Sequence, residues 1–161
     1  VALSYKPLQS YDDIDSHILF NSNLCVIAGK DNPVAKKERI RLAELENLPL
    51  VLPAKGLQAR NAFDSLLYGQ NFKFDVRLEI NDLSMLLDMV SRTNLVTLLS
   101  GATIHSNKNF VAISLDHPHS EMQGSFHLLK GTYCKNATKE FLKMLVENNS
   151  FLMAMEAIAN R

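Results

Sequence analysis

The segment that decides the fold runs from Leu48 to Ile104 and reads LPLVLPAKGLQARNAFDSLLYGQNFKFDVRLEINDLSMLLDMVSRTNLVTLLSGATI. Three short apolar runs in it, residues 49–53, 76–80 and 95–99, have the length and composition of strands. Between them, apolar residues recur at helical spacing in two stretches, one from Gly56 to about Gly69 and one after Asn81-Asp82. The pattern therefore predicts strand, helix, strand, helix, strand.

Strands that alternate with helices predict a parallel sheet, because each crossover helix returns the chain to the same edge. In such sheets, ligands bind at the carboxyl ends of strands, beside helix N-termini. The segment therefore predicts both an α/β fold and the position of a site.

Outside this segment, the N-terminal strand and the C-terminal helix are expected to belong to a second sheet whose other strands are missing. Strands are expected at residues 1–5, 24–28, 110–115 and 124–130, a loop at 11–16, and a closing helix from Asn136. The first predicted strand begins at residue 1 without a loop before it, and we therefore expect the chain to be a piece of a longer protein. The apolar tail 151–158 is expected to cover a groove or to join a partner chain.

Composition excludes several classes. The chain has 161 residues, of which 47% are hydrophobic, so a sizeable core is possible. Lys plus Arg equals Asp plus Glu at 17 each, which gives the chain no electrostatic reason to hold DNA or an acidic membrane by itself. No apolar run has the length of a membrane span. Two isolated cysteines, Cys25 and Cys134, favour a reduced, cytoplasmic location over a disulfide scaffold.

Several short motifs, in their order, resemble the effector-binding domain of LysR-type transcriptional regulators. They are Asp31-Asn32-Pro33-Val34-Ala35, then Ile40-Arg41-Leu42-Ala43-Glu44-Leu45, then Pro49-Leu50-Val51-Leu52. Glu79-Ile80-Asn81-Asp82 looks like the family's second crossover, and Lys139-Glu140-Phe141-Leu142 looks like its closing helix. The run 90–99 is similar to the branch that contains the cyanate-responsive regulator.

The resemblance implies an α/β, periplasmic-binding-protein-like (type 2) domain with two lobes and a small-molecule cleft between them. It divides the chain into a remnant of lobe one with a hinge strand (1–29), a complete lobe two (30–115), and a return strand with C-terminal helices on lobe one (116–161). It also implies a homodimer or homotetramer, and an upstream helix-turn-helix domain for DNA that is absent here.

The turn after the first strand of the 48–104 segment is the main candidate ligand site. Free N–H groups at a helix N-terminus bind anions, and Gly56 allows close approach of a ligand. Positive charge and hydrogen bonds are expected from the same segment, which comprises Lys55, Gly56, Leu57, Gln58, Ala59 and Arg60. A solvated loop with an ordinary helix start is the alternative.

Five further residues are candidate contacts. Asn81 starts the second helix, and Thr97 and Ser100 lie on or after the third strand. Ser4 and Tyr5 end a lobe-one strand that would face the cleft. Capping explains Asn81 equally well, and a buried tyrosine with a satisfied hydroxyl explains Tyr5. His117 and His119 lack the spacing of strong zinc motifs, so no metal and no cofactor is expected.

Three functions compete. The leading hypothesis is a domain that senses a small anion or carboxylate by binding it and catalyses no reaction. An extracytoplasmic solute-binding protein of the same fold is the second. An α/β enzyme is the third, although the chain has no G-x-S-x-G, no phosphate-binding G-x-x-x-x-G-K-[ST] and no H-E-x-x-H.

Overall fold

The computed structural model describes residues 2–5, 11–131 and 135–148, and for residues 3–5 and 145–148 it describes the backbone alone. The strands are β1 (Ala2–Tyr5), β2 (Ile14–Gly29), β3 (Arg39–Ile40), β4 (Pro49–Pro53), β5 (Asp75–Ile80), β6 (Thr97–Ser100), β7 (Phe110–Leu115) and β8 (Glu121–Leu129). The α-helices are α1 (Gln58–Leu66), α2 (Leu83–Arg92) and α3 (Asn136–Asn148). Short 3₁₀ helices lie at Pro33–Lys36, Leu42–Asn47 and Gly101–Ile104.

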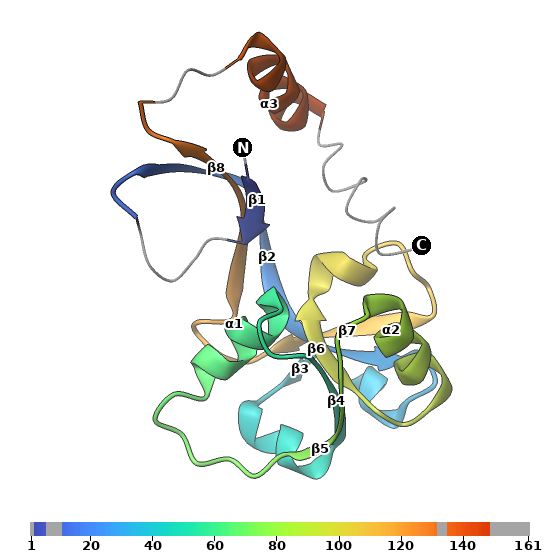
Figure 1. Ribbon diagram of the computed structural model, residues 1–161. Coiled ribbons are helices and arrows are strands. Elements are labelled where there is room, and N and C mark those ends of the chain that lie inside the picture. The colour runs from blue at the N-terminus through green and yellow to red at the C-terminus, as the bar shows by residue number, and fades with distance from the viewer. Residues whose placement is uncertain (1, 6–10, 132–134, 149–161) are drawn as a thin grey trace.

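Strand β2 belongs to two sheets and connects them (Figure 1). Its residues 24–29 pair antiparallel with β6 and β7 in what we call the main body, which also holds β3, β4, β5, α1 and α2. Its residues 14–23 pair antiparallel with β8, and β8 pairs with β1, in what we call the outer sheet. Helix α3 follows the outer sheet at the far end of the molecule (Figure 1).

The predicted parallel unit is present in the main body. β4 and β5 pair in parallel, and Leu50 forms a parallel bridge to Val96 just before β6. Two hydrogen bonds hold that bridge, from Val51 N to the Val96 carbonyl and from Val96 N to the Pro49 carbonyl, each 3.0 Å. The prediction of parallel strands is therefore confirmed for this segment.

The third strand of this unit also pairs outside the unit. β6 pairs antiparallel with β2 along Leu24–Ser100 to Ile27–Thr97, and β7 adds to the other edge of β2. The 48–104 segment thus supplies only part of the main-body strands, because β6 needs β2 to satisfy its second edge.

The expected loop at 11–16 is right for residues 11–13 and wrong from Ile14, where β2 already begins. The side chains from Asp15 to Ile18 are exposed, so this part of the strand carries no apolar alternation that sequence reasoning could detect. The expected apolar tail at 151–158 lies outside the described residues.

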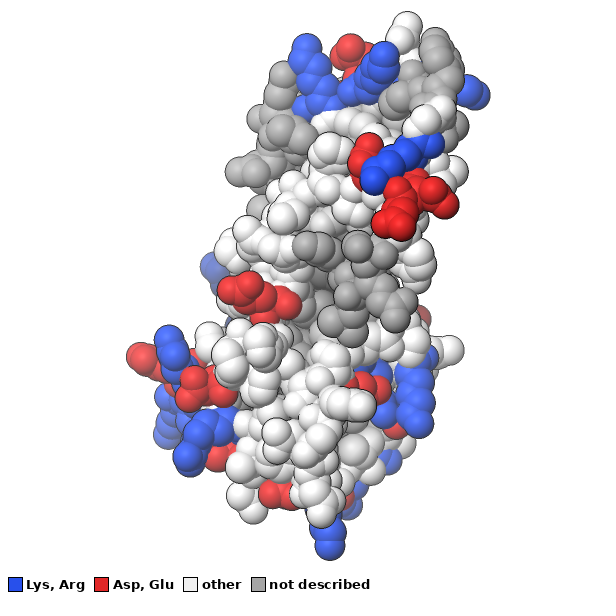
Figure 2. Space-filling model, turned by 90° about the vertical axis from the view of Figure 1, so that its left-hand side faces the viewer, with Lys and Arg blue, Asp and Glu red and all other residues white. Residues whose placement is uncertain are grey.

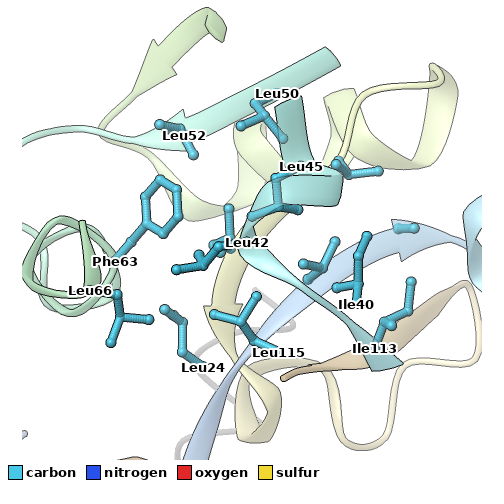
Figure 3. Packing of buried hydrophobic residues seen from close by; sticks show 14 of the residues in the cluster. Leu24, Ile40, Leu42, Leu45, Leu50, Leu52, Phe63, Leu66, Ile113 and Leu115 are labelled. Carbon is cyan, nitrogen blue, oxygen red and sulfur yellow. The ribbon is translucent and has the colours of Figure 1, made fainter. Parts of the chain in front are cut away.

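The larger core cluster lies between α1 and the main-body sheet (Figure 3). Phe63 and Leu66 point from α1 toward leucines of β4, β2 and the 3₁₀ helix Leu42–Asn47, and Phe63 is only 1% exposed. They lie three residues apart, so both fall on the one face of α1 that meets the sheet. A second core cluster lies on the other side of the main-body strands. It joins Leu86, Leu87 and Val90 of α2 to Val51 of β4 and Ile27 of β2.

The surface is charged but mixed. On the face seen in Figure 2, basic and acidic side chains lie next to one another, with wide uncharged areas between them. No helix among the described residues is both long and apolar enough to cross a membrane.

Phe63→Ala is expected to lower the free energy of unfolding by about 3–5 kcal/mol, because it removes a buried ring and leaves a cavity. Urea unfolding followed by circular dichroism measures the loss. The matched control is Tyr68→Ala, since Tyr68 is 94% exposed, and its effect is expected to stay within about 0.5 kcal/mol. Equal losses in both variants would contradict the assignment of α1 to the core.

Candidate functional site

The predicted site begins where β4 ends and α1 starts. The chain turns through Gly56, whose φ of +93° is a conformation that side-chain-bearing residues rarely adopt. Leu57 N donates to the Ala54 carbonyl at 3.2 Å and closes the turn. Leu57 is the N-cap of α1, and its apolar side chain forms no capping hydrogen bond. The first turn of α1 therefore lacks the side-chain acceptor that normally satisfies its N–H groups.

The start of α2 differs in this respect. The Asp82 carboxylate accepts a hydrogen bond from Met85 N at 2.7 Å, so the protein caps this helix itself. Asn81 precedes the cap and is exposed. Of the two crossover helices, only α1 lacks a side-chain cap.

Arg60 is engaged by protein groups. Its guanidinium forms ion pairs of 2.9 Å with Asp64 and 3.0 Å with Glu79, and it donates to the Pro53 carbonyl at 3.1 Å. The Arg60 side chain is 9% exposed, whereas the two carboxylates are 45% and 42% exposed. Arg60 thus ties α1 to the ends of β4 and β5, although the sequence predicted it as a ligand contact.

Burial by itself lowers the pKa of the Arg60 guanidinium, but hydrogen bonds to Asp64 and Glu79 outweigh burial, so the net pKa is raised. The guanidinium stays charged, and two carboxylates compensate that charge. Lys55, Leu57 and Gln58 are exposed, and Ala59 is half-buried. Lys55 is therefore the exposed cation that remains in the predicted segment.

A pair of hydroxyls lies at the carboxyl end of β6. Ser22 Oγ and Ser100 Oγ are 2.7 Å apart, and Ala102 N donates to Ser22 Oγ at 3.4 Å. Helix α1 packs against β6 and against β2, the two strands that carry these serines. The structure therefore assembles Ser100 with Ser22, a residue that the sequence analysis missed. The signal was present in the alternation of β2, where Ser22 and Leu24 share a face while Asn21 and Asn23 are exposed.

Thr97 lies apart from Ser100. It begins β6 whereas Ser100 ends it, which separates them by about 10 Å at 3.3 Å per residue. Thr97 is fully buried, and its Oγ1 has no hydrogen-bond partner among the described residues. The structure therefore does not bring Thr97 to the carboxyl edge where the topological argument placed it.

For Ser4 and Tyr5 the structure describes only the backbone. In register, Ser4 lies opposite Ser125 and Tyr5 opposite Gly124 of β8. Both belong to the outer sheet, as the sequence predicted for a strand outside the 48–104 segment. Ser125 is buried, and its hydroxyl has no partner within the described part of the chain.

Within residues 2–5, 11–131 and 135–148, no group of three His, Cys, Asp or Glu side chains is arranged to hold a metal ion. Burial raises the pKa of the Cys25 thiol, against a smaller opposing effect of a hydrogen bond from the Gly101 backbone, so this thiol is held protonated. Cys134 lies outside the described residues.

An open hollow of about 560 Å³ lies elsewhere, between the end of β2 and the C-terminal end of α2. Lys30, Asp31, Asp88 and Arg92 contribute to its lining, and Arg92 pairs with Asp88 at 2.7 Å. Opposite charges offset one another there, and none of the predicted site residues lines it.

Arg60→Ala is expected to lower the free energy of unfolding by about 1–3 kcal/mol, because it leaves the Pro53 carbonyl and two carboxylates without their shared donor. Lys55→Ala is the matched control, with an expected change within about 0.5 kcal/mol because Lys55 is exposed. Urea unfolding of both variants measures the difference. A loss no larger for Arg60→Ala than for Lys55→Ala would count against a structural role for Arg60.

Comparisons with known proteins agree with this architecture. The CcmR regulatory domain of Synechocystis PCC6803, solved in complex with 2-PG, is 22% identical, with a TM-score of 0.77 over 91% of this chain and 73% of its own. The effector binding domain of QuiR in complex with shikimate is 19% identical, with a TM-score of 0.72 over 89% of this chain and 69% of its own. Full-length CbnR complexed with target DNA is 10% identical, with a TM-score of 0.71 over 89% of this chain and 50% of its own. These likenesses confirm the predicted periplasmic-binding-protein-like α/β fold.

A family model described as the LysR substrate binding domain matches residues 1–150. The predicted resemblance to the effector-binding domain of this family is thereby confirmed, and the chain belongs to the LysR substrate binding domain family.

Proposed function

We propose that this chain is the effector-sensing part of a LysR-type transcriptional regulator and that its effector is a small anion or carboxylate. The observation that carries the proposal is the uncapped N-terminus of α1 at the carboxyl end of β4. The N–H groups of such a helix end, together with the helix dipole, favour a negative group. The exposed Lys55 adds charge, and the Ser22–Ser100 hydroxyls add neutral hydrogen-bonding groups.

In this proposal Arg60 acts indirectly. By tying α1 to Pro53 and Glu79, it holds the helix start in place at the strand ends. The ligand contacts are then the backbone at 56–60, the Gln58 side chain and the Ser100 hydroxyl. Asn81, Thr97, Ser4 and Tyr5 remain predictions for the same cleft.

The chemistry proposed is recognition alone, without a bond made or broken. The effector would bind one arrangement of the main body and the outer sheet more tightly than another. It would thereby shift the equilibrium between these two conformations. In a homodimer or homotetramer, that shift would alter the spacing of upstream helix-turn-helix domains and thus DNA binding in the cytoplasm. The similarity of residues 90–99 to the cyanate-responsive branch supports an anionic effector, and cyanate belongs among the compounds tested.

The experiment is a thermal-shift screen of cyanate, shikimate and small mono- and dicarboxylates on three proteins: the parent, Leu57→Asp and Leu57→Ala. A ligand at a hundred times its Kd stabilises by about 2.7 kcal/mol, which corresponds to a rise in Tm of roughly 5–10 °C. Leu57→Asp places a carboxylate at the N-cap, where the extended backbone suits it. This variant is expected to be about 1 kcal/mol more stable without ligand and to lose most of the shift.

Leu57→Ala is the control, because it removes the same exposed side chain without adding an acceptor. It is expected to keep the ligand response of the parent protein. An equal shift in all three proteins would place the ligand elsewhere. No shift in the parent with any anion would contradict an anionic effector bound by this chain.

A further inference from the structure

The main body and the outer sheet are joined by a two-stranded connection. Residues 21–23 of β2 face residues 121–123 of β8, and within the described chain these six residues pair only with one another. Below them β2 enters the main-body sheet at Leu24, and above them β1 joins β8 at Gly124. We call residues 20–23 and 121–124 the ribbon. Two-stranded ribbons twist and bend more readily than wider sheets.

The upper end of the ribbon carries an irregularity. The β2–β8 register shifts between Ile18 and Phe20, so Leu19 has no partner on β8. Such a bulge bends the strand and increases its twist. Glycine inside a strand marks a bend or a close approach, and Gly124 lies directly opposite Phe20 at this point.

The Phe20 ring occupies the space that a side chain at residue 124 would need. A Cβ added to Gly124 would overlap the Cε1, Cζ and Cδ1 atoms of Phe20. The ring therefore lies against the bare backbone of β8, next to the bulge. Any residue larger than glycine would force the ring away or change the angle between the strands.

The lower end of the ribbon is tied to the main body. Ser22 shares a hydrogen bond with Ser100 and accepts another from Ala102 N. Met122, opposite Ser22, is 4% exposed and belongs to the larger core cluster. Bending is thus opposed at residues 22 and 122, so the next point along the ribbon where it can occur is the bulge beside Phe20 and Gly124.

We propose that the contact of Phe20 with Gly124 is the pivot between the main body and the outer sheet, and that it sets the angle between them. The pivot lies two residues from Ser22, on the same face of β2. This inference concerns the conformation of the chain without any ligand, so its test is independent of the proposed effector.

The test measures the distance between two spin labels by double electron–electron resonance. The labels are attached through Lys36→Cys on the main body, where Lys36 is exposed, and Leu129→Cys on the outer sheet, where Leu129 is 64% exposed. Cys25 and Cys134 are replaced by alanine, and unlabelled protein is added in excess to dilute labels between subunits. The parent is compared with Phe20→Ala, Gly124→Ala and the double variant, and Tyr68→Ala is the aromatic control.

Phe20→Ala is expected to broaden the distance distribution, because no ring then packs against Gly124 beside the bulge. Gly124→Ala is expected to shift its mean, because the added methyl displaces the ring. In the double variant the methyl meets no ring, so the distribution should match that of Phe20→Ala. Tyr68→Ala should leave the distribution unchanged.

Two results would overturn the proposal. One is a Phe20→Ala distribution that coincides with the parent, and this variant decides the question alone if Gly124→Ala does not fold. The other is a shift from Gly124→Ala that persists unchanged in the Phe20→Ala background, which would show that the glycine acts without the ring.

Discussion

The structure depends on strand β2, which pairs on both edges in the main body and continues into the outer sheet. Its lower half satisfies the second edge of β6 and the edge of β7, and its upper half pairs with β8. Buried backbone groups must be hydrogen-bonded, so β6 cannot be buried in the main body without β2 beside it. The same strand therefore completes the core, carries Ser22 to the carboxyl end of β6, and supports the outer sheet.

The candidate site follows from that arrangement. The core fixes α1 on the sheet through Phe63 and Leu66, and Arg60 fixes its first turn through Pro53, Asp64 and Glu79. A buried arginine that lost one of these partners would be costly, so the cluster holds one geometry. The uncapped start of α1 is the part of this arrangement that the proposed site uses, and the difference between Leu57 of α1 and Asp82 of α2 distinguishes the two crossover helices.

Much of the architecture was accessible from local pattern. The strand 49–53 and the strand 110–115 appear with the predicted bounds, and the two crossover helices appear where apolar spacing placed them. The beginning of β2 was missed because its side chains are exposed on a narrow sheet, and exposed strands carry no alternation of apolar and polar residues. The burial of Arg60 was missed because its partners are the Pro53 carbonyl and the Glu79 carboxylate of β5. No local sequence pattern relates these groups to Arg60.

The sequence by itself determined the order of strands and helices, the family resemblance, and the segment around Gly56 as a helix start. These properties depend on neighbours within a few positions, where spacing and residue type are sufficient. Only the tertiary structure decided that Arg60 forms an ion pair with Glu79 and that Ser22 hydrogen-bonds to Ser100, with Thr97 at the other end of β6. It also decided that the Phe20 ring lies against Gly124. Each of these facts joins residues that are far apart along the chain or on different strands, and the pairing of strands across a sheet is set by packing of the whole fold.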